Sequence, residues 1–445
     1  MEKRKIQAEI DSYQTKTPKS LEMQRKASRY LPGGSSRGTA YFDPYPHFIE
    51  RGKGSYVYDV DGNKYLDFMI NATSLILGHA NRHISAVIKD QIDLGAAYSG
   101  PTESQINLAE ILCTRIPSID TIRFTNSGTE ATMMAIRAAR LYTGKEKIVK
   151  IEGGYHGSHE YVSVSVYTPQ DKLNPSGPAP IPEYDGQPKN VAEGVFVVEY
   201  NDIEGMRDIL DCYSHEIACV IMEPVVSSFG YLPADQEYLE FVREKTSELG
   251  IVLIFDEVQS FRLSSGGAQE FFNVVPDMTA LGKIIGGGLA VGAFGGKKEI
   301  MNGFDPSNGG AEIAHAGTFN ANPLTMKAGI VVMESLTDDV YLRMNALGKE
   351  IREKLNAVFS ELDVSVQITG IGSFFGMHFT DKAISNYRDV VTTESATKKA
   401  FFLAMLNEGV LLNGLSGSLN VYSTGEDVDE LVSAVRKVAV RLFKS

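Results

Sequence analysis

The sequence contains little cysteine, no long uninterrupted apolar run and fewer basic than acidic residues. Its three cysteines, Cys113, Cys212 and Cys219, show no Cys-x-x-Cys spacing. This excludes a disulfide framework and a cysteine zinc site, gives no reason to expect a metal, and fits a reducing cytoplasm. The longest apolar stretch, residues 284–294, is broken by glycines and is shorter than the roughly 20 residues of a membrane-spanning helix. Residues 1–10 are charged and lack the apolar core of a secretory signal.

The charge balance also restricts the function. Asp and Glu outnumber Lys and Arg by 56 to 43, which gives a formal net charge of −13. Nucleic-acid-binding proteins usually carry a basic stripe, so we expect no nucleic-acid partner, although a local basic pocket for a small anion stays compatible with this charge. The chain is otherwise of ordinary globular composition, with 43% apolar and 22% charged residues in 445, and can bury a large core.

Short apolar runs alternate with helical patterns through the middle of the chain. The apolar runs, which predict strands, are residues 121–124, 147–151, 194–198, 218–222 and 251–255; helical periodicity covers residues 129–142, 203–212 and 236–249. Strands that are apolar throughout are buried on both faces, as in a parallel sheet with helices on each side. The pattern therefore predicts an α/β fold with a mostly parallel central sheet.

The last third of the chain has a different pattern, which predicts a second domain. Long helices are expected at residues 324–336 and 340–362, short strands near 373–378 and 418–423, and helices at 393–407 and 427–443. We predict an N-terminal segment at 1–75 that contributes to a smaller domain, a large domain at 76–330, and a C-terminal small α+β domain at 331–445.

Glycine is slightly over-represented, at 42 of 445 residues, and several glycines flank polar groups. Ser127-Gly128-Thr129 stands between a predicted strand and a predicted helix. The unpaired N–H groups of a helix N-terminus bind anions, although the same sequence also suits an ordinary N-cap. Gly154-Tyr155-His156-Gly157 follows a strand and offers either an aromatic face for a planar ligand or a plain loop turn.

Two charged residues complete this set. Asp256 follows the most apolar strand, at the edge where α/β sheets bind ligands; it is either a cap or a charge directed at a ligand. Lys283 lies among glycines and apolar residues. Most lysines are solvated, but desolvation lowers the pKa of an amine and makes it a nucleophile.

An anion cradle, an aromatic face, an acid at a strand end and a buried lysine are together what pyridoxal 5'-phosphate (PLP) requires. Its aldehyde forms a Schiff base with a lysine, and an acid keeps its pyridine nitrogen protonated so that the ring withdraws electrons. In these motifs and their order the sequence resembles the class III aminotransferases of PLP fold type I, over roughly residues 31–443. The densest matches are residues 123–131, 154–157, 222–224, 256–258 and 281–288. The glutamate-1-semialdehyde aminomutases and the β-phenylalanine-type β-amino acid aminotransferases are the most similar subgroups.

The resemblance implies the role of each matching residue. Lys283 is implied to be the Schiff-base lysine and the base of the proton shift, and Asp256 the acid on the pyridine nitrogen. The implied cofactor contacts are Ser127, Gly128 and Thr129 at the phosphate, Tyr155 on the ring with His156 beside it, Glu223 as a supporting acid, Gln259 at the phenolic oxygen, and Thr318 at the phosphate of the neighbouring subunit. The last contact implies a homodimer with active sites at its interface.

The substrate side of the resemblance is mixed. Arg37, in Pro32-Gly33-Gly34-Ser35-Ser36-Arg37, matches the carboxylate-binding arginine of the β-amino acid enzymes, a residue type whose planar fork holds both carboxylate oxygens; otherwise it is a surface arginine. Residues 411–418 lack the acid that the aminomutases carry there. They also lack the arginine that the β-amino acid enzymes often use, because no Lys or Arg stands between Lys399 and Arg436. Either the acceptor is not 2-oxoglutarate, or its second carboxylate is bound elsewhere.

We therefore expect an aminotransferase that moves an amino group between an amino acid, including a β-amino acid, or an amine and a keto acid or aldehyde. An aminomutase or racemase would use the same cofactor residues and is the alternative. A dinucleotide-dependent oxidoreductase is a distant one, because it requires Gly-x-Gly-x-x-Gly after the first strand, where this chain has Asn126-Ser127-Gly128-Thr129.

Overall fold

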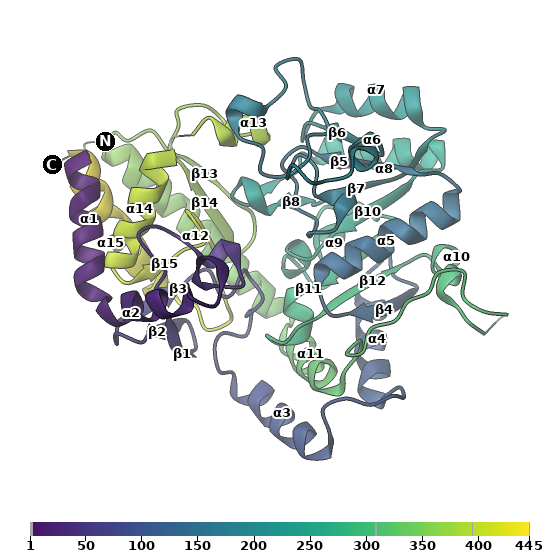
Figure 1. Ribbon diagram of the computed structural model, residues 1–445, viewed down its shortest axis with the longest axis horizontal. Coiled ribbons are helices and arrows are strands. Elements are labelled where there is room, and N and C mark those ends of the chain that lie inside the picture. Colours follow the sequence, from purple (N-terminus) through teal and green to yellow (C-terminus); the bar gives the residue numbers. More distant parts are fainter. Residues whose placement is uncertain (1–2, 308, 394, 445) are drawn as a thin grey trace.

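The centre of the molecule is a seven-stranded sheet. The computed structural model describes residues 3–307, 309–393 and 395–444. In spatial order the strands are β4 (Thr121–Thr125), β12 (Gly292–Gly296), β11 (Met278–Gly282), β10 (Val252–Asp256), β7 (Ile217–Met222), β5 (Lys147–Ile151) and β6 (Val195–Val198). All run in the same direction except β12, which is antiparallel to both neighbours. The fold is therefore of the mixed α/β class with a mostly parallel central sheet, as the apolar runs predicted (Figure 1).

Helices cover both faces of this sheet because its strands are apolar on both faces. On one side lie α7 (Ile203–Tyr213) and α8 (Gln236–Leu249), and on the other α5 (Gly128–Thr143). In β10, Leu253 and Phe255 join the core on the α7–α8 side, whereas Val252 and Ile254 join the core under α5. At one end of the sheet a further core holds α3 (Arg82–Leu94), α4 (Glu103–Arg115) and α11 (Pro323–Ser335).

The N-terminal and C-terminal parts of the chain lie together beside the large sheet (Figure 1). The C-terminal sheet is β13 (Gln367–Thr369), β14 (Phe374–His378) and β16 (Ser416–Ser418), with α12 (Asp338–Glu361), α14 (Ser395–Asn407) and α15 (Gly425–Ala439) packed around it. The N-terminal sheet is β1 (Ile49–Lys53), β2 (Tyr56–Asp59) and β3 (Lys64–Asp67), completed by β15 (Val410–Leu411), which pairs in parallel with β3. This pairing joins the N-terminal sheet to the C-terminal part of the chain; the division at residues 75 and 330 stays a prediction.

The remaining helices are short or terminal. They are α1 (Lys3–Lys16), α2 (Pro18–Ala27), α6 (Lys189–Glu193), α9 (Ala268–Phe271), α10 (Lys298–Met301) and α13 (Tyr387–Val391). A membrane-crossing helix, which needs both length and apolarity, does not occur in the part of the chain that the structure describes.

Two of the differences between the structure and the predicted elements concern strands near the site. The strand expected at residues 418–423 is wrong: β16 ends at Ser418, and the chain then turns, with the Asn420 N–H donating to Ser423 Oγ at 3.1 Å. The strands β11 and β12 were not predicted. β12 reads Gly-Ala-Phe-Gly-Gly, and glycine is depleted in strands, so its sequence carries no strand pattern.

Candidate active site

The predicted site residues converge on the edge of the sheet where its parallel strands end. Asp256 ends β10, Glu223 follows β7, and Lys283 follows β11. A cavity of about 590 Å³ opens at this edge. Of the predicted residues, it is lined by Arg37, Ser127, Gly128, Thr129, Tyr155, His156, Glu223, Asp256, Gln259 and Lys283. The topology thus brings residues between Arg37 and Lys283 into one cavity, as a shared cofactor site requires.

The N-terminus of α5 forms one wall of the cavity. Ser127 is its N-cap, with the side chain accepting from Glu130 N–H at 3.2 Å. The Gly128 and Thr129 N–H groups have no acceptor among the described residues. A Cβ on Gly128 would meet Val258 at 3.0 Å, so the backbone there sits closer to its neighbours than a side chain would allow. Free N–H groups at the positive end of a helix of this length suit a phosphate.

Asp256 is held in place by two partners. His156 Nδ1 lies 2.9 Å from Asp256 Oδ2, and the Val258 N–H donates to Asp256 Oδ1 at 3.1 Å. Because a carboxylate only accepts, Nδ1 carries the proton. Burial lowers the pKa of His156, and its Nε2 is buried with no partner among the described residues; both favour the neutral imidazole. The ring therefore orients the carboxylate without neutralising its charge.

Lys283 has an unusual backbone and an unusual environment. Its φ is +49°, a left-handed conformation that costs a residue with a side chain on the order of 1–3 kcal/mol and that collects at functional sites. Burial lowers the pKa of the Lys283 amine, while the charges of Asp256 and Glu223 raise it and Arg37 lowers it. The lysine thus faces two buried acids, and burial favours its nucleophilic form.

Glu223 is a second buried acid next to Asp256. Its Oε1 accepts from the Ser227 hydroxyl at 2.9 Å, while its Oε2 is buried and has no partner among the described residues. Burial, followed by the charge of Asp256, raises the pKa of Glu223 well above its usual value. A buried acid with an unfilled oxygen is consistent with a ligand contact at this point.

A left-handed turn that the sequence did not reveal positions two predicted residues. Ile70, Asn71, Ala72 and Thr73 all have φ between +37° and +74°. Within this turn Asn71 Oδ1 accepts from Arg37 Nη1 at 2.6 Å, and the Thr73 hydroxyl donates to Gln259 Oε1 at 2.6 Å. The turn therefore connects the predicted substrate arginine with the predicted cofactor residue.

Two predicted residues lie at the periphery. Tyr155 is 40% exposed, and its ring stacks with that of Tyr167 at 6.2 Å between centroids. Thr318 is exposed and does not line the cavity of its own chain. A residue that acts on a neighbouring subunit's cofactor would be placed in this way, but the roles of all these residues stay predictions.

The residues present fit PLP. The free N–H groups at α5 suit its phosphate, Asp256 lies buried where a pyridine nitrogen needs an acid, and Lys283 supplies a buried amine. Gly157, with φ +101°, packs against Thr129 where a Cβ would clash at 2.6 Å. When bound, PLP supplies an aldehyde for the lysine and a ring that withdraws electrons from a bond to the substrate's amine-bearing carbon.

The sheet topology and this constellation define a fold type I PLP-dependent enzyme. Residues 39–424 match the model of the class-III aminotransferases, and the chain belongs to that family. Its cofactor is pyridoxal 5'-phosphate, as in a solved transaminase with PLP bound that is 34% identical and superposes with a TM-score of 0.88 over 95% of this chain and 97% of that one.

Further relatives differ in the reaction for which they are named. A glutamate-1-semialdehyde 2,1-aminomutase from Methanosphaera stadtmanae is 38% identical over 96% of this chain and 100% of its own. An ω-transaminase from Sphaerobacter thermophilus is 41% identical, with a TM-score of 0.90 over 94% and 96% of the two chains. A β-phenylalanine aminotransferase from Variovorax paradoxus is 31% identical, with a TM-score of 0.87 over 98% and 97%.

Proposed function

We propose that the protein is an aminotransferase that moves an amino group from an amino acid, including β-amino acids, or an amine to a keto acid or aldehyde. The observation that carries this proposal is a second cavity of about 780 Å³ next to the cofactor site. The two cavities share Arg37, Asn71 and Ser227. The second cavity therefore opens from the cofactor cavity and can hold the part of a substrate that extends away from the cofactor.

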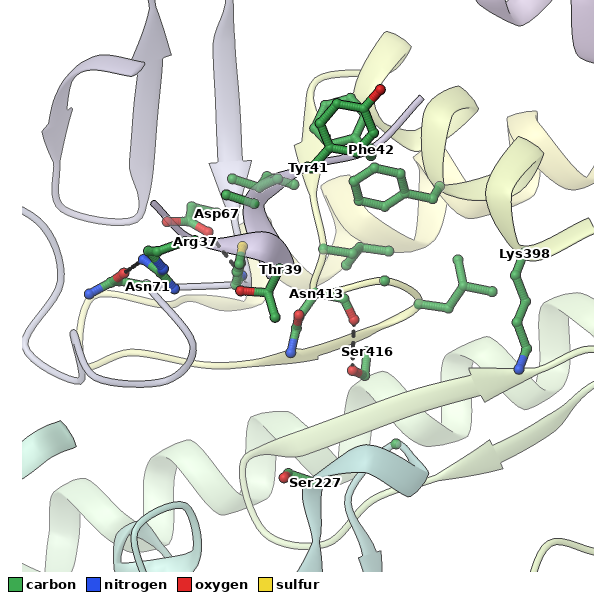
Figure 2. Close-up of a pocket in the computed structure, with 18 of the residues that line it drawn as sticks. Arg37, Thr39, Tyr41, Phe42, Asp67, Asn71, Ser227, Lys398, Asn413 and Ser416 are labelled. Atoms are coloured by element: carbon green, nitrogen blue, oxygen red, sulfur yellow. Dashed lines mark hydrogen bonds between the residues drawn. The ribbon is translucent and has the colours of Figure 1, made fainter. Parts of the chain in front are cut away.

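This substrate cavity has a largely apolar wall. Its apolar lining includes Tyr41, Phe42, Met69, Phe402, Leu411, Leu412 and Leu415. The loop Asn413–Ser416 also lines it and contains no acid (Figure 2). Such a cavity favours donors with bulky or extended apolar groups over the small polar glutamate semialdehyde, since binding follows the apolar area removed from water.

Arg37 is the proposed site for a carboxylate close to the amine. It lines both cavities, and Asn71 fixes one of its nitrogens. The rest of its guanidinium is available to a carboxylate, which arginine binds through parallel hydrogen bonds. This placement supports a donor whose carboxylate stands near its amine, as in α- and β-amino acids.

An aminomutase is the second candidate, and the names of the curated relatives favour it. Several archaeal glutamate-1-semialdehyde 2,1-aminomutases are 38–40% identical to this chain. These names support an aminomutase more strongly than they support a transferase. The site carries no acid in the 413–416 loop and has a wide apolar cavity, and on these grounds we keep the transferase first.

The two candidates are separated by following the amino group. The pyridoxamine form of the enzyme is incubated with a panel of keto acids and aldehydes, and the returning PLP absorbance band and the amino products are measured. Transfer to an external acceptor supports the aminotransferase. Conversion of glutamate 1-semialdehyde to 5-aminolevulinate without any acceptor, together with no reaction across the panel, would show an aminomutase.

The carboxylate assignment has its own test. Arg37→Ala should lower kcat/KM for α- and β-amino acids about tenfold to a hundredfold, which is the worth of a charged hydrogen bond. Simple amines should react as before. Equal losses for both donor classes would remove Arg37 from substrate binding.

A further inference from the structure

The left-handed turn that carries Asn71 and Thr73 needs support from its surroundings. Ile70 and Thr73 are β-branched, and their φ values of +37° and +74° lie in a region that such residues rarely adopt. The turn nevertheless carries two short hydrogen bonds. Arg37 donates to Asn71 at 2.6 Å (Figure 2), and Thr73 donates to Gln259 at the same distance. Strain of this kind persists only where the surrounding contacts impose it.

Asp67, at the end of β3, holds the start of the turn. Its Oδ1 accepts from the Met69 N–H at 2.9 Å and from the Ile70 N–H at 2.8 Å. Its Oδ2 lies 2.7 Å from Nε2 of His79, and this nitrogen carries the proton because a carboxylate only accepts. Asp67 is 3% exposed, and both of its oxygens are bonded within the protein. It therefore lines the substrate cavity without being available to a substrate.

A second support reaches the turn at its other end. The Thr73 carbonyl accepts from Nη1 of Arg262 at 3.4 Å, and the Arg262 side chain is fully buried. This bond is long, whereas the two bonds to Asp67 are short and end on a carboxylate, an acceptor that makes hydrogen bonds about twice as strong as neutral ones. Asp67 is thus the stronger of these two supports.

The turn also decides which end of the Gln259 amide faces the cofactor. Because the Thr73 hydroxyl donates to Gln259 Oε1, the amide Nε2 is left to donate elsewhere. Gln259 lines the cofactor cavity, where its predicted partner is the phenolic oxygen of PLP. An amide with the opposite orientation would present an acceptor to that oxygen and would repel it.

We propose that Asp67 is a positioning residue that sets Arg37 and Gln259 through the left-handed turn. His79 orients the carboxylate for this role. One buried acid then fixes a substrate contact and a cofactor contact together, because both belong to the same four-residue turn. The part that concerns Arg37 rests on the proposed function. The part that concerns Gln259 rests only on PLP binding and on the predicted contact with the phenolic oxygen.

The test follows the absorbance of PLP in the holoenzyme as a function of pH. This absorbance changes as the phenolic group gains or loses a proton. A donor on the phenolic oxygen stabilises its ionised form, so Gln259→Ala should raise the pH midpoint by about 0.5–1 pH unit, the worth of one hydrogen bond. Asp67→Ala should raise it by a similar amount, and the double variant should shift it no further.

Further variants separate positioning from charge. Loss of a negative charge by itself would lower the midpoint, because such a charge favours the protonated form. Asp67→Asn keeps an oxygen for the two N–H groups and should stay near the wild-type midpoint. If Asp67→Ala does not fold, Asp67→Ser takes its place with the same expectation, since its side chain is one atom shorter than that of Asp and withdraws the acceptor.

Asp59 provides a matched control for stability. It is fully buried at the end of the neighbouring strand β2 and accepts from the N–H groups of Asp61 and Asn63 at 3.0 and 2.8 Å, but it lines neither cavity. Asp59→Ala should therefore leave the midpoint unchanged. The proposal is overturned by an unchanged or lowered midpoint in Asp67→Ala, or by an equal rise in Asp67→Asn or Asp59→Ala.

The part that concerns Arg37 has its own measurement. 3-Phenylpropionate has a carboxylate but no amine, so calorimetry with the holoenzyme measures its binding without reaction. Arg37→Ala and Asp67→Ala should each weaken this binding about tenfold, and the double variant should bind no more weakly than either. Equal or undetectable binding in wild type and Asp67→Ala, or additive losses, rejects Asp67 as the support of Arg37. If no amino donor reacts with the wild type, the aminotransferase function fails, while the PLP midpoints still decide the role of Asp67.

Discussion

At the scale of single residues, the site depends on charges buried close to one another. Lys283 faces Asp256 and Glu223, and His156 fixes the orientation of Asp256. Each of these groups would be costly alone in a protein interior. The attraction between the opposite charges offsets part of the desolvation cost. It leaves the Lys283 amine, with a lowered pKa, beside a carboxylate that is held in place.

The pH dependence of cofactor attachment tests this arrangement. If Lys283 is the lysine that binds the cofactor, its neutral amine is the reacting form, and Asp256 raises the pKa of that amine by stabilising its cation. Asp256→Asn removes this stabilisation, so the pKa of Lys283 should fall. The rate at which apoenzyme takes up PLP covalently should then reach its plateau at a lower pH. A midpoint that stays in place or moves upward would contradict the assigned electrostatics.

The site residues that the sequence predicts from residue patterns are those carried by local motifs. Ser127, Asp256 and Lys283 each stand beside a glycine or at the end of an apolar run, where chemistry and local structure coincide. Asn71 and Thr73 were not predicted, because their role depends on partners far away in the sequence, Arg37 and Gln259. No local pattern indicates such a contact.

At the scale of elements, β12 shows a conflict between propensity and packing. Because of its glycines, its sequence does not predict a strand, yet the close packing around it leaves no room for larger side chains. A Cβ on Gly292 would collide with the Ser127 carbonyl oxygen and the Thr125 hydroxyl. The strand is glycine-rich here because the N-terminus of α5 presses against it. The helices on the sheet and the buried strands β4, β5, β6, β7 and β10 were predicted from their apolar runs, which the two covered faces of the sheet require, whereas the buried strands β11 and β12 were not predicted.

Two substitutions in β12 separate the contact of Gly292 with the N-terminus of α5 from a general effect on stability. Gly292→Ala and Gly295→Ala both crowd the strand, the second against Ile119 and the Thr121 carbonyl at 2.7 Å, and each should cost about 1–3 kcal/mol of unfolding free energy. Only Gly292→Ala displaces Ser127, at the predicted phosphate site Ser127–Thr129, and its Kd for PLP should rise roughly tenfold, or about 1.4 kcal/mol. PLP affinity is measured by absorbance titration. Equal affinity in the two variants would show that Gly292 does not position the predicted phosphate site.

At the scale of the whole molecule, Thr318 lies outside the cavity of its own chain. Its neighbour Phe319 is 59% exposed, and a large exposed apolar side chain beside a predicted functional residue suits an interface. We propose that the enzyme is a homodimer in which Thr318 completes the partner's cofactor site. Light scattering should then give twice the chain mass of 48.7 kDa.

Mixed dimers test the contribution across the interface. Subunits with Lys283→Ala are combined with subunits carrying Thr318→Ala. If Thr318 acts on the neighbouring cofactor, each mixed dimer has one site with both residues intact, and that site should recover wild-type PLP affinity. If Thr318 acts within its own chain, no mixed dimer recovers.

The central claim is that Lys283 is the lysine that holds the cofactor, and borohydride reduction followed by mass spectrometry tests it most directly. Reduction fixes PLP permanently to the lysine that carries it. The structure offers a real competitor, because Lys150 is fully buried and burial lowers its pKa to about 7; its Nζ, however, donates to the carbonyls of Ile151 and Val164. We predict that the pyridoxyl label is found on the peptide containing Lys283 and disappears in Lys283→Ala. A label on Lys150, or on any other lysine of the wild-type protein, would contradict the account.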